Sequence, residues 1–224
     1  AHATSLLCCT ASSDFGELED PTDPAQLQAL FDYVVTDPIL GDDLFTLTLS
    51  VENQTPVSGF DAAFNINAIF LNGTSDVLSL TLVSVTDEGA GLVTGSWGNE
   101  SGSSSGAGHV LEKAENIGGF DDFGFSLWEG TGLNNPSVIQ PGETSIFVFT
   151  VAAATGQTID MDSFNVGFNG NDTSPMGAKF VSCVGSDCVS PDDSAFGSGV
   201  VPEPGTGLLL GTGLLALGAW RRRS

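Results

Sequence analysis

The strongest constraint on the fold is a two-residue alternation of apolar and polar side chains in the first half of the chain. In residues 44–51, apolar side chains occupy every second position from Phe45 onward, with Thr or Ser between them. Residues 64–70 and 78–82 repeat the alternation on the two sides of an Asn72-Gly73 turn signal. Successive side chains of a β-strand point to opposite faces, so each segment is predicted to be a strand with one buried face. The turn between the last two predicts a hairpin.

Four later segments have the same strand character: residues 123–127, 145–151, 164–168 and 178–184. Residues 27–36 fit two interpretations, a short helix that begins after Asp23 or a first strand. About seven short strands with turn residues between them predict an all-β fold, an antiparallel β-sandwich of jelly-roll or Ig-like type over residues 25–185. The 15 Phe residues are expected to fill the layer between its sheets.

The segments on either side of the predicted sandwich have a different composition. Residues 1–24 are polar and acidic, contain two prolines, and are predicted to be a flexible N-terminal arm or the remnant of a leader. Residues 186–200 are rich in Ser, Gly, Asp and Pro, which predicts a linker that holds the following tail away from the core.

The charge of the chain excludes one class of partner. It has 28 Asp and Glu residues against 5 Lys and Arg residues, which gives a formal net charge of −23. Nucleic-acid binding depends on Lys and Arg side chains that neutralise phosphates, so no nucleic-acid partner is expected. An acidic surface of this kind favours solubility or divalent cations.

Clusters of oxygen-bearing side chains are the candidate cation ligands. Ca²⁺ prefers carboxylate and amide oxygens, but no cluster has the spacing of an EF-hand. The best candidates for a Ca²⁺ site are Asp160, Asp162, Asn169, Asn171 and Asp172. The alternative is that these side chains simply form a solvated acidic surface.

Two cysteines lie close enough in sequence to form a small loop. Cys183 and Cys188 bracket Val-Gly-Ser-Asp, a turn-forming stretch, and are predicted to form a disulfide in an oxidising compartment. Free thiols and a metal site are the alternatives. Cys8 and Cys9 are adjacent, and their pairing is left open because a bridge between neighbours is strained.

No constellation of residues indicates an enzyme. His2 and His109 are the two histidines, and neither lies in a motif that would activate a nucleophile or bind a catalytic metal. Carboxylate pairs could hydrolyse glycosides, but the sequence nominates no pair. Trp97 and Trp128 would suit sugar rings if their faces were exposed, whereas burial in the core is the alternative.

The last two dozen residues are built in three parts. Pro202, Glu203 and Pro204 come first, then the uncharged residues 205–220, then Arg221, Arg222 and Arg223. As a helix, residues 205–220 would span ~24 Å at ~1.5 Å per residue, slightly less than the ~30 Å of a hydrocarbon core. They are predicted to be a single transmembrane helix outside the folded domain, with the arginines on the cytoplasmic side.

This tripartite tail, residues 201–224, resembles the PEP-CTERM sorting signal of exported proteins in Gram-negative bacteria that make extracellular polysaccharide. The resemblance implies that an exosortase, a membrane peptidase, recognises Pro202, Glu203 and Pro204 and cuts there. It also implies that residues 205–220 anchor the chain in the inner membrane transiently and that Arg221 to Arg223 retain it until cleavage.

The sequence therefore predicts an exported, non-enzymatic protein of the cell surface or of the exopolysaccharide matrix of a biofilm. Its expected partners are the exosortase-like peptidase, the inner membrane and matrix components. The alternatives are a secreted carbohydrate-binding protein, a polysaccharide hydrolase, and a fibre subunit that self-associates through its edge strands.

Overall fold

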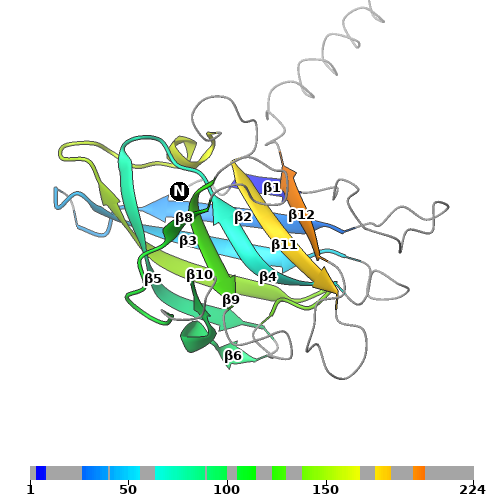
Figure 1. Cartoon of the computed structure of the whole chain (residues 1–224). Coiled ribbons are helices and arrows are strands. Elements are labelled where there is room, and N and C mark those ends of the chain that lie inside the picture. Colours follow the sequence, from blue (N-terminus) through cyan, green and yellow to red (C-terminus); the bar gives the residue numbers. More distant parts are fainter. Residues whose placement is uncertain are drawn as a thin grey trace, which may run out of the picture.

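The computed structural model describes residues 4–8, 27–39, 41–55, 64–88, 90–99, 105–114, 123–129, 138–166, 175–182 and 194–199. This part of the chain consists mostly of antiparallel strands, which form two sheets (Figure 1). The predicted all-β antiparallel fold is confirmed. The predicted helix at residues 205–220 lies outside the described residues.

The first sheet has the order β1-β2-β3-β10-β5-β6 and the second has the order β12-β11-β4-β9-β7, with β8 also paired to β9. The strands of the first sheet are β1 (Thr4–Cys8), β2 (Ala29–Thr36), β3 (Leu44–Asn53), β10 (Thr144–Ala153), β5 (Val77–Asp87) and β6 (Gly91–Leu92). Those of the second are β12 (Ser194–Gly199), β11 (Met176–Ser182), β4 (Phe64–Leu71), β9 (Phe123–Glu129), β7 (Trp97–Gly98) and β8 (Glu112–Ala114). Among the described residues, two short 3-10 helices, η2 (Thr94–Ser96) and η3 (Asp162–Phe164), lie between strands.

Both sheets contribute to one hydrophobic core. Phe147 and Phe149 of β10 belong to the same buried cluster as Phe64 of β4 and Phe180 of β11. The long strands from β3 to β11 lie alternately in the first and the second sheet. The chain therefore passes from one sheet to the other between successive long strands. Burial of these aromatic side chains from both sides is the main force that holds the sheets together.

The alternation in residues 44–51 has the predicted structural result. Phe45, Leu47, Leu49 and Val51 of β3 are buried, and the Thr and Ser side chains between them are partly exposed. The ambiguous residues 27–36 are resolved as a strand, because Ala29–Thr36 pairs with β3 along its whole length.

A bulge in β4 exchanges the two faces of that strand. Ala68 lies opposite Lys179 and Ile66 opposite Phe180, so Asn67 is an extra residue. Phe64 and Ile66 belong to the main core before the bulge, and Ile69 and Leu71 after it. Ala68 and Phe70 instead join Phe123 and Trp128 in a second, smaller cluster. One inserted residue reverses the direction of every later side chain, because the side-chain period of a strand is two.

Bulges also modify β5. Leu78 has no partner between the pairs Ala152–Ser79 and Ala153–Val77, and Val83 has none between Val148–Ser84 and Phe149–Leu82. Leu78 is 62% exposed and Val83 is 46% exposed, whereas Leu80 and Leu82 are buried. The predicted alternation of residues 78–82 thus holds for Leu80 and Leu82 but not for Leu78.

The structure differs from the sequence predictions at one connection and at one strand. Strands β4 and β5 do not form a hairpin, because β4 lies in the second sheet and β5 in the first. The turn between them is held to other parts of the fold: Asn72 N donates to Pro175 O at 2.8 Å, and Thr74 N donates to Ser163 O at 2.9 Å. The predicted strand at residues 164–168 is absent over residues 164–166, where η3 ends.

The described part of the fold extends beyond the predicted limits 25–185 at both ends. Thr4–Cys8, which the sequence placed in a flexible arm, pairs with β2 as the edge strand β1. Ser194–Gly199, which the sequence placed in a linker, pairs with β11 as the edge strand β12. An exposed sheet edge offers unpaired backbone groups, so it can add a strand whose side chains show little pattern of their own.

Candidate functional site

The structure describes some of the predicted site residues and not others. Asp160, Asp162, Trp97 and Trp128 lie in the described part of the chain. The remaining predicted site residues lie outside it: Asn169, Asn171, Asp172, Cys183, Cys188, Pro202, Glu203, Pro204, Arg221, Arg222 and Arg223. The Ca²⁺ site, the disulfide and the sorting tail therefore stay predictions as far as geometry is concerned.

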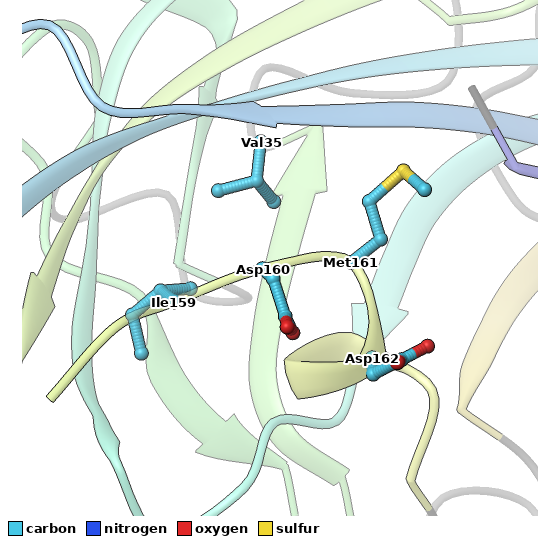
Figure 2. A pocket seen from close by; sticks show the side chains of 5 residues that line it. All are labelled: Val35, Ile159, Asp160, Met161 and Asp162. Carbon is cyan, nitrogen blue, oxygen red and sulfur yellow. The ribbon is translucent and has the colours of Figure 1, made fainter. Parts of the chain in front are cut away.

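A surface hollow brings Asp160 and Asp162 beside strand β2. It has a volume of about 270 Å³ and is lined by Val35, Ile159, Asp160, Met161 and Asp162 (Figure 2). Val35 comes from β2, and the other four residues precede or begin η3. In Figure 2 the two carboxylates point in different directions.

Tyr33 attaches the rim of this hollow to the sheet. Its hydroxyl donates a hydrogen bond to Met161 O at 3.2 Å, and its ring packs edge-on against Phe164 with 6.5 Å between centroids. Burial, and then the charges of Asp162 and Asp160, raise the pKa of Tyr33 to about 12. The hydroxyl is therefore a neutral donor at physiological pH and serves to position the loop.

Asp160 stabilises its own loop. Its Oδ1 accepts hydrogen bonds from Ser163 N and Ser163 Oγ, both at 3.1 Å, and Asp160 N donates to Ser163 Oγ at 3.1 Å. These local bonds close the turn that leads into η3. Within the described residues, no group of three or more His, Cys, Asp or Glu side chains is placed to hold a metal ion. Asp160 thus has a structural role that the sequence did not reveal.

The structure buries both of the tryptophans that the sequence offered as possible sugar contacts. Trp97 is 0% exposed and packs edge-on against Phe147, with 4.9 Å between the ring centroids. Trp128 is 6% exposed, and its ring lies against Phe70, with 5.5 Å between the centroids. The ammonium group of Lys179 lies 4.9 Å from the centre of the Trp128 ring. Large aromatic side chains gain most from burial, and here packing takes both rings away from solvent.

A second acidic group, between β5 and β10, was not singled out from the sequence. Asp87 is 1% exposed, with Oδ2 accepting from Ser145 Oγ at 2.7 Å and Oδ1 accepting from Ala90 N at 2.8 Å. Burial raises the pKa of the nearby Glu143. A hydrogen bond from the Gln140 backbone lowers this pKa, and the charges of Asp87 and Glu88 raise it further. Both oxygens of Asp87 are committed to the strand connection, so this carboxylate holds the fold.

Asn53 connects the two sheets at one end of the sandwich. This fully buried residue ends β3, and its Nδ2 donates to Phe64 O at 3.0 Å and to Ile139 O at 2.9 Å. Its Oδ1 accepts from Thr55 N at 3.1 Å. Every polar atom of the amide is thus used. The only sequence signal for this role is an Asn at the end of a predicted strand, next to turn residues. Such an Asn can be buried if its amide finds hydrogen-bond partners.

The comparisons with known proteins bear on the tail. Residues 200–223 match the PEP-CTERM protein-sorting motif. No curated protein and no solved structure matches the chain. Among the helices of the described residues, none has the length and apolar character needed to cross a membrane. The functional feature that the comparisons identify is therefore the C-terminal one: this chain carries the PEP-CTERM protein-sorting motif, which marks exported proteins that an exosortase sorts from a membrane-anchored state.

Proposed function

We propose that this chain is a non-enzymatic structural protein of the cell surface or exopolysaccharide matrix of a Gram-negative bacterium, released there by an exosortase. The observation that carries the proposal is the sorting motif at residues 200–223, attached to an antiparallel β domain. In this motif Pro202, Glu203 and Pro204 are the recognition residues, residues 205–220 are the transient inner-membrane anchor, and the three arginines stop translocation.

The properties of the β domain suit an extracellular structural role. Its core is built from aromatic and aliphatic side chains of both sheets, and the net charge of −23 keeps the chain soluble and repels other anionic surfaces. The buried carboxylate of Asp87 and the loop carboxylate of Asp160 both make hydrogen bonds that hold the fold. Those two acids are thus accounted for by structural roles.

Sorting and release by the exosortase are tested by replacing Pro202, Glu203 and Pro204 with alanine in the host that carries the exosortase. We expect the variant to stay in the membrane fraction with its arginines, while the natural chain is released and ends near residues 202–205. Intact-mass analysis of both fractions gives the result. The matched control replaces Pro191, Asp192 and Asp193 with alanine, a nearby proline-acid triplet outside the motif. Release of material that ends at Ser224 would refute the proposal.

The structural role is tested on the released protein. We expect it to sediment with the host's exopolysaccharide without generating new reducing ends. Release of reducing ends at a rate above that of heat-unfolded protein would instead identify a polysaccharide hydrolase. Deletion of the gene is expected to weaken the matrix while leaving the amount of polysaccharide unchanged.

A further inference from the structure

Strand β12 joins the β domain directly to the sorting motif. Its six residues pair antiparallel with β11, from Ser194 opposite Val181 to Gly199 opposite Met176. The match to the sorting motif begins at the next residue, 200. Two valines alone stand between Gly199 and Pro202. The composition of residues 186–200 predicts a spacer, yet the part nearest the motif belongs to the sheet.

This arrangement limits the distance between the sorting motif and the end of strand β12. An extended chain spans at most ~3.6 Å per residue, so Pro202 lies within roughly 11 Å of Gly199, and residue 205 within roughly 22 Å. A membrane peptidase that takes up Pro202 to Pro204 needs free backbone before and after the motif. While β12 is paired, the backbone immediately upstream of the motif is hydrogen-bonded to β11 and is not free for the peptidase.

Strand β12 is also well suited to leave the sheet. Among the described strands it is the last in the order of its sheet, so β11 is its one hydrogen-bonded neighbour there, and it lies beside β1 at this edge (Figure 1). Its sequence, Ser-Ala-Phe-Gly-Ser-Gly, contains two Gly and two Ser residues. Gly and Ser have low β-propensity, so we expect an edge strand in which they make up four of six residues to separate from its neighbour more readily than a strand of β-branched residues. The strands inside the sheet, which are paired on both sides, do not share this property.

We propose that β12 is a detachable strand that controls processing. It leaves β11 in the membrane-bound precursor so that the motif enters the peptidase, and it pairs with β11 again once the tail is removed. Residues 194–199 then serve as a linker before cleavage and as an edge strand afterwards, which accounts for both their composition and their pairing. This inference rests on the proposed function, since it presumes cleavage at the motif.

The first test locks β12 to β11 with a disulfide. Lys179 and Phe196 are directly opposed in the register, so the double substitution Lys179→Cys and Phe196→Cys places two thiols side by side. In the full-length chain expressed in the exosortase host, we expect the locked precursor to be processed at least about tenfold more slowly, because the competent state is reduced to a small population. A membrane-permeant reductant restores processing, and Lys179→Cys alone is processed normally.

The second test lengthens the reach of the motif in the locked chain. A flexible Gly-Ser spacer inserted between residues 199 and 200 is expected to restore processing of the locked chain, because the motif then reaches the peptidase while β12 stays paired. The matched control places the same spacer between residues 192 and 193, upstream of β12. There it does not move the motif away from the paired strand, so the locked chain stays unprocessed.

The outcomes separate this inference from the proposed function. If the locked chain is processed at the natural rate, β12 does not need to detach and the inference is wrong. If the spacer after residue 199 fails to rescue the locked chain, the lock does not act by holding the motif near the sheet, and the inference is also wrong. The proposed function survives either result as long as the natural chain is processed and the alanine variant of Pro202 to Pro204 is not. If the natural chain itself is never cut, both fail.

Discussion

Replacement of Asn53 tests whether a single buried amide joins the two sheets. In Asn53→Ala, Phe64 O and Ile139 O lose a donor and Thr55 N loses its acceptor, all at a buried corner. A buried polar group left unsatisfied costs about 1–3 kcal/mol. Ile139 O keeps a second bond, from Ile66 N at 2.9 Å, so its loss falls at the low end of that range. We therefore expect a total loss of about 3–5 kcal/mol of unfolding free energy.

The assay is urea unfolding of the protein released from the cell surface, followed by circular dichroism. The matched control is Asn165→Ala, because Asn165 is exposed at the end of η3. We expect the control to change the unfolding free energy by less than about 0.5 kcal/mol. The slope of the free energy with urea is expected to stay the same in both variants.

A conservative variant gives a second, independent readout. Asn53→Asp keeps the shape of the side chain but directs an acceptor at two carbonyl oxygens. Burial and those oxygens raise the pKa of such a carboxyl in the folded state, so the variant is expected to recover stability as the pH falls and the group is protonated. If Asn53→Ala costs no more than Asn165→Ala, or if Asn53→Asp shows no such recovery, the amide does not join the sheets and the reasoning is wrong.

Three further predictions follow from the described contacts and the sequence. Tyr33 is the one tyrosine of the chain, and burial and the charges of Asp162 and Asp160 raise its pKa from 10.0 to about 12. The unfolded state therefore loses the phenolic proton first, and after solvent screening is allowed for, stability should fall by about 1–2 kcal/mol between about pH 10 and pH 12. Absorbance titration of the native protein measures the pKa, and Tyr33→Phe should abolish this part of the alkaline loss. Val83→Thr, on the bulge of β5, should change the unfolding free energy by less than about 0.5 kcal/mol, whereas Leu82→Thr next to it should lower that free energy by about 2–4 kcal/mol. Urea unfolding measures both, and equal costs would show that the bulge does not expose Val83. Millimolar Ca²⁺ should raise the melting temperature if the predicted oxygen ligands near residues 160–172 bind it, and identical melting with Ca²⁺ and with a chelator would remove that site.

The fold class followed from side-chain period alone, while several details depended on pairing. The buried positions of β3 agree with the alternation, because both of its neighbours are in regular register over those positions. The extra residue Asn67 in β4, and the extra residues Leu78 and Val83 in β5, change which face of the strand is buried. A bulge is stabilised by the partner strand, so a single strand's sequence does not reveal it. The hairpin prediction failed for the same reason: the Asn72-Gly73 turn leads to the other sheet, and contacts with Pro175 and Ser163 hold it there.

For the candidate sites, the sequence predicts features that are contiguous in the chain, whereas features that depend on contacts between distant residues need the structure. The sorting motif is contiguous, so its order of Pro-Glu-Pro, apolar residues and arginines is legible without a structure, and the comparison at residues 200–223 agrees with it. The role of Trp97 is spatial: the same residue would suit a sugar if exposed, and the structure packs it against Phe147. The roles of Asn53 and Asp87 likewise depend on groups far away in sequence.

The sequence by itself determined that the chain is an antiparallel β protein with an acidic character and a C-terminal sorting signal, since each of these depends on composition, a two-residue period or a contiguous motif. Tertiary structure alone decided which sheet each strand joins, where bulges turn apolar side chains outward, and that residues 194–199 close an edge of the second sheet. The physical reason is that strand pairing joins backbone groups distant in sequence, and the backbone of an edge strand pairs with its neighbour whether or not its own side chains show a pattern.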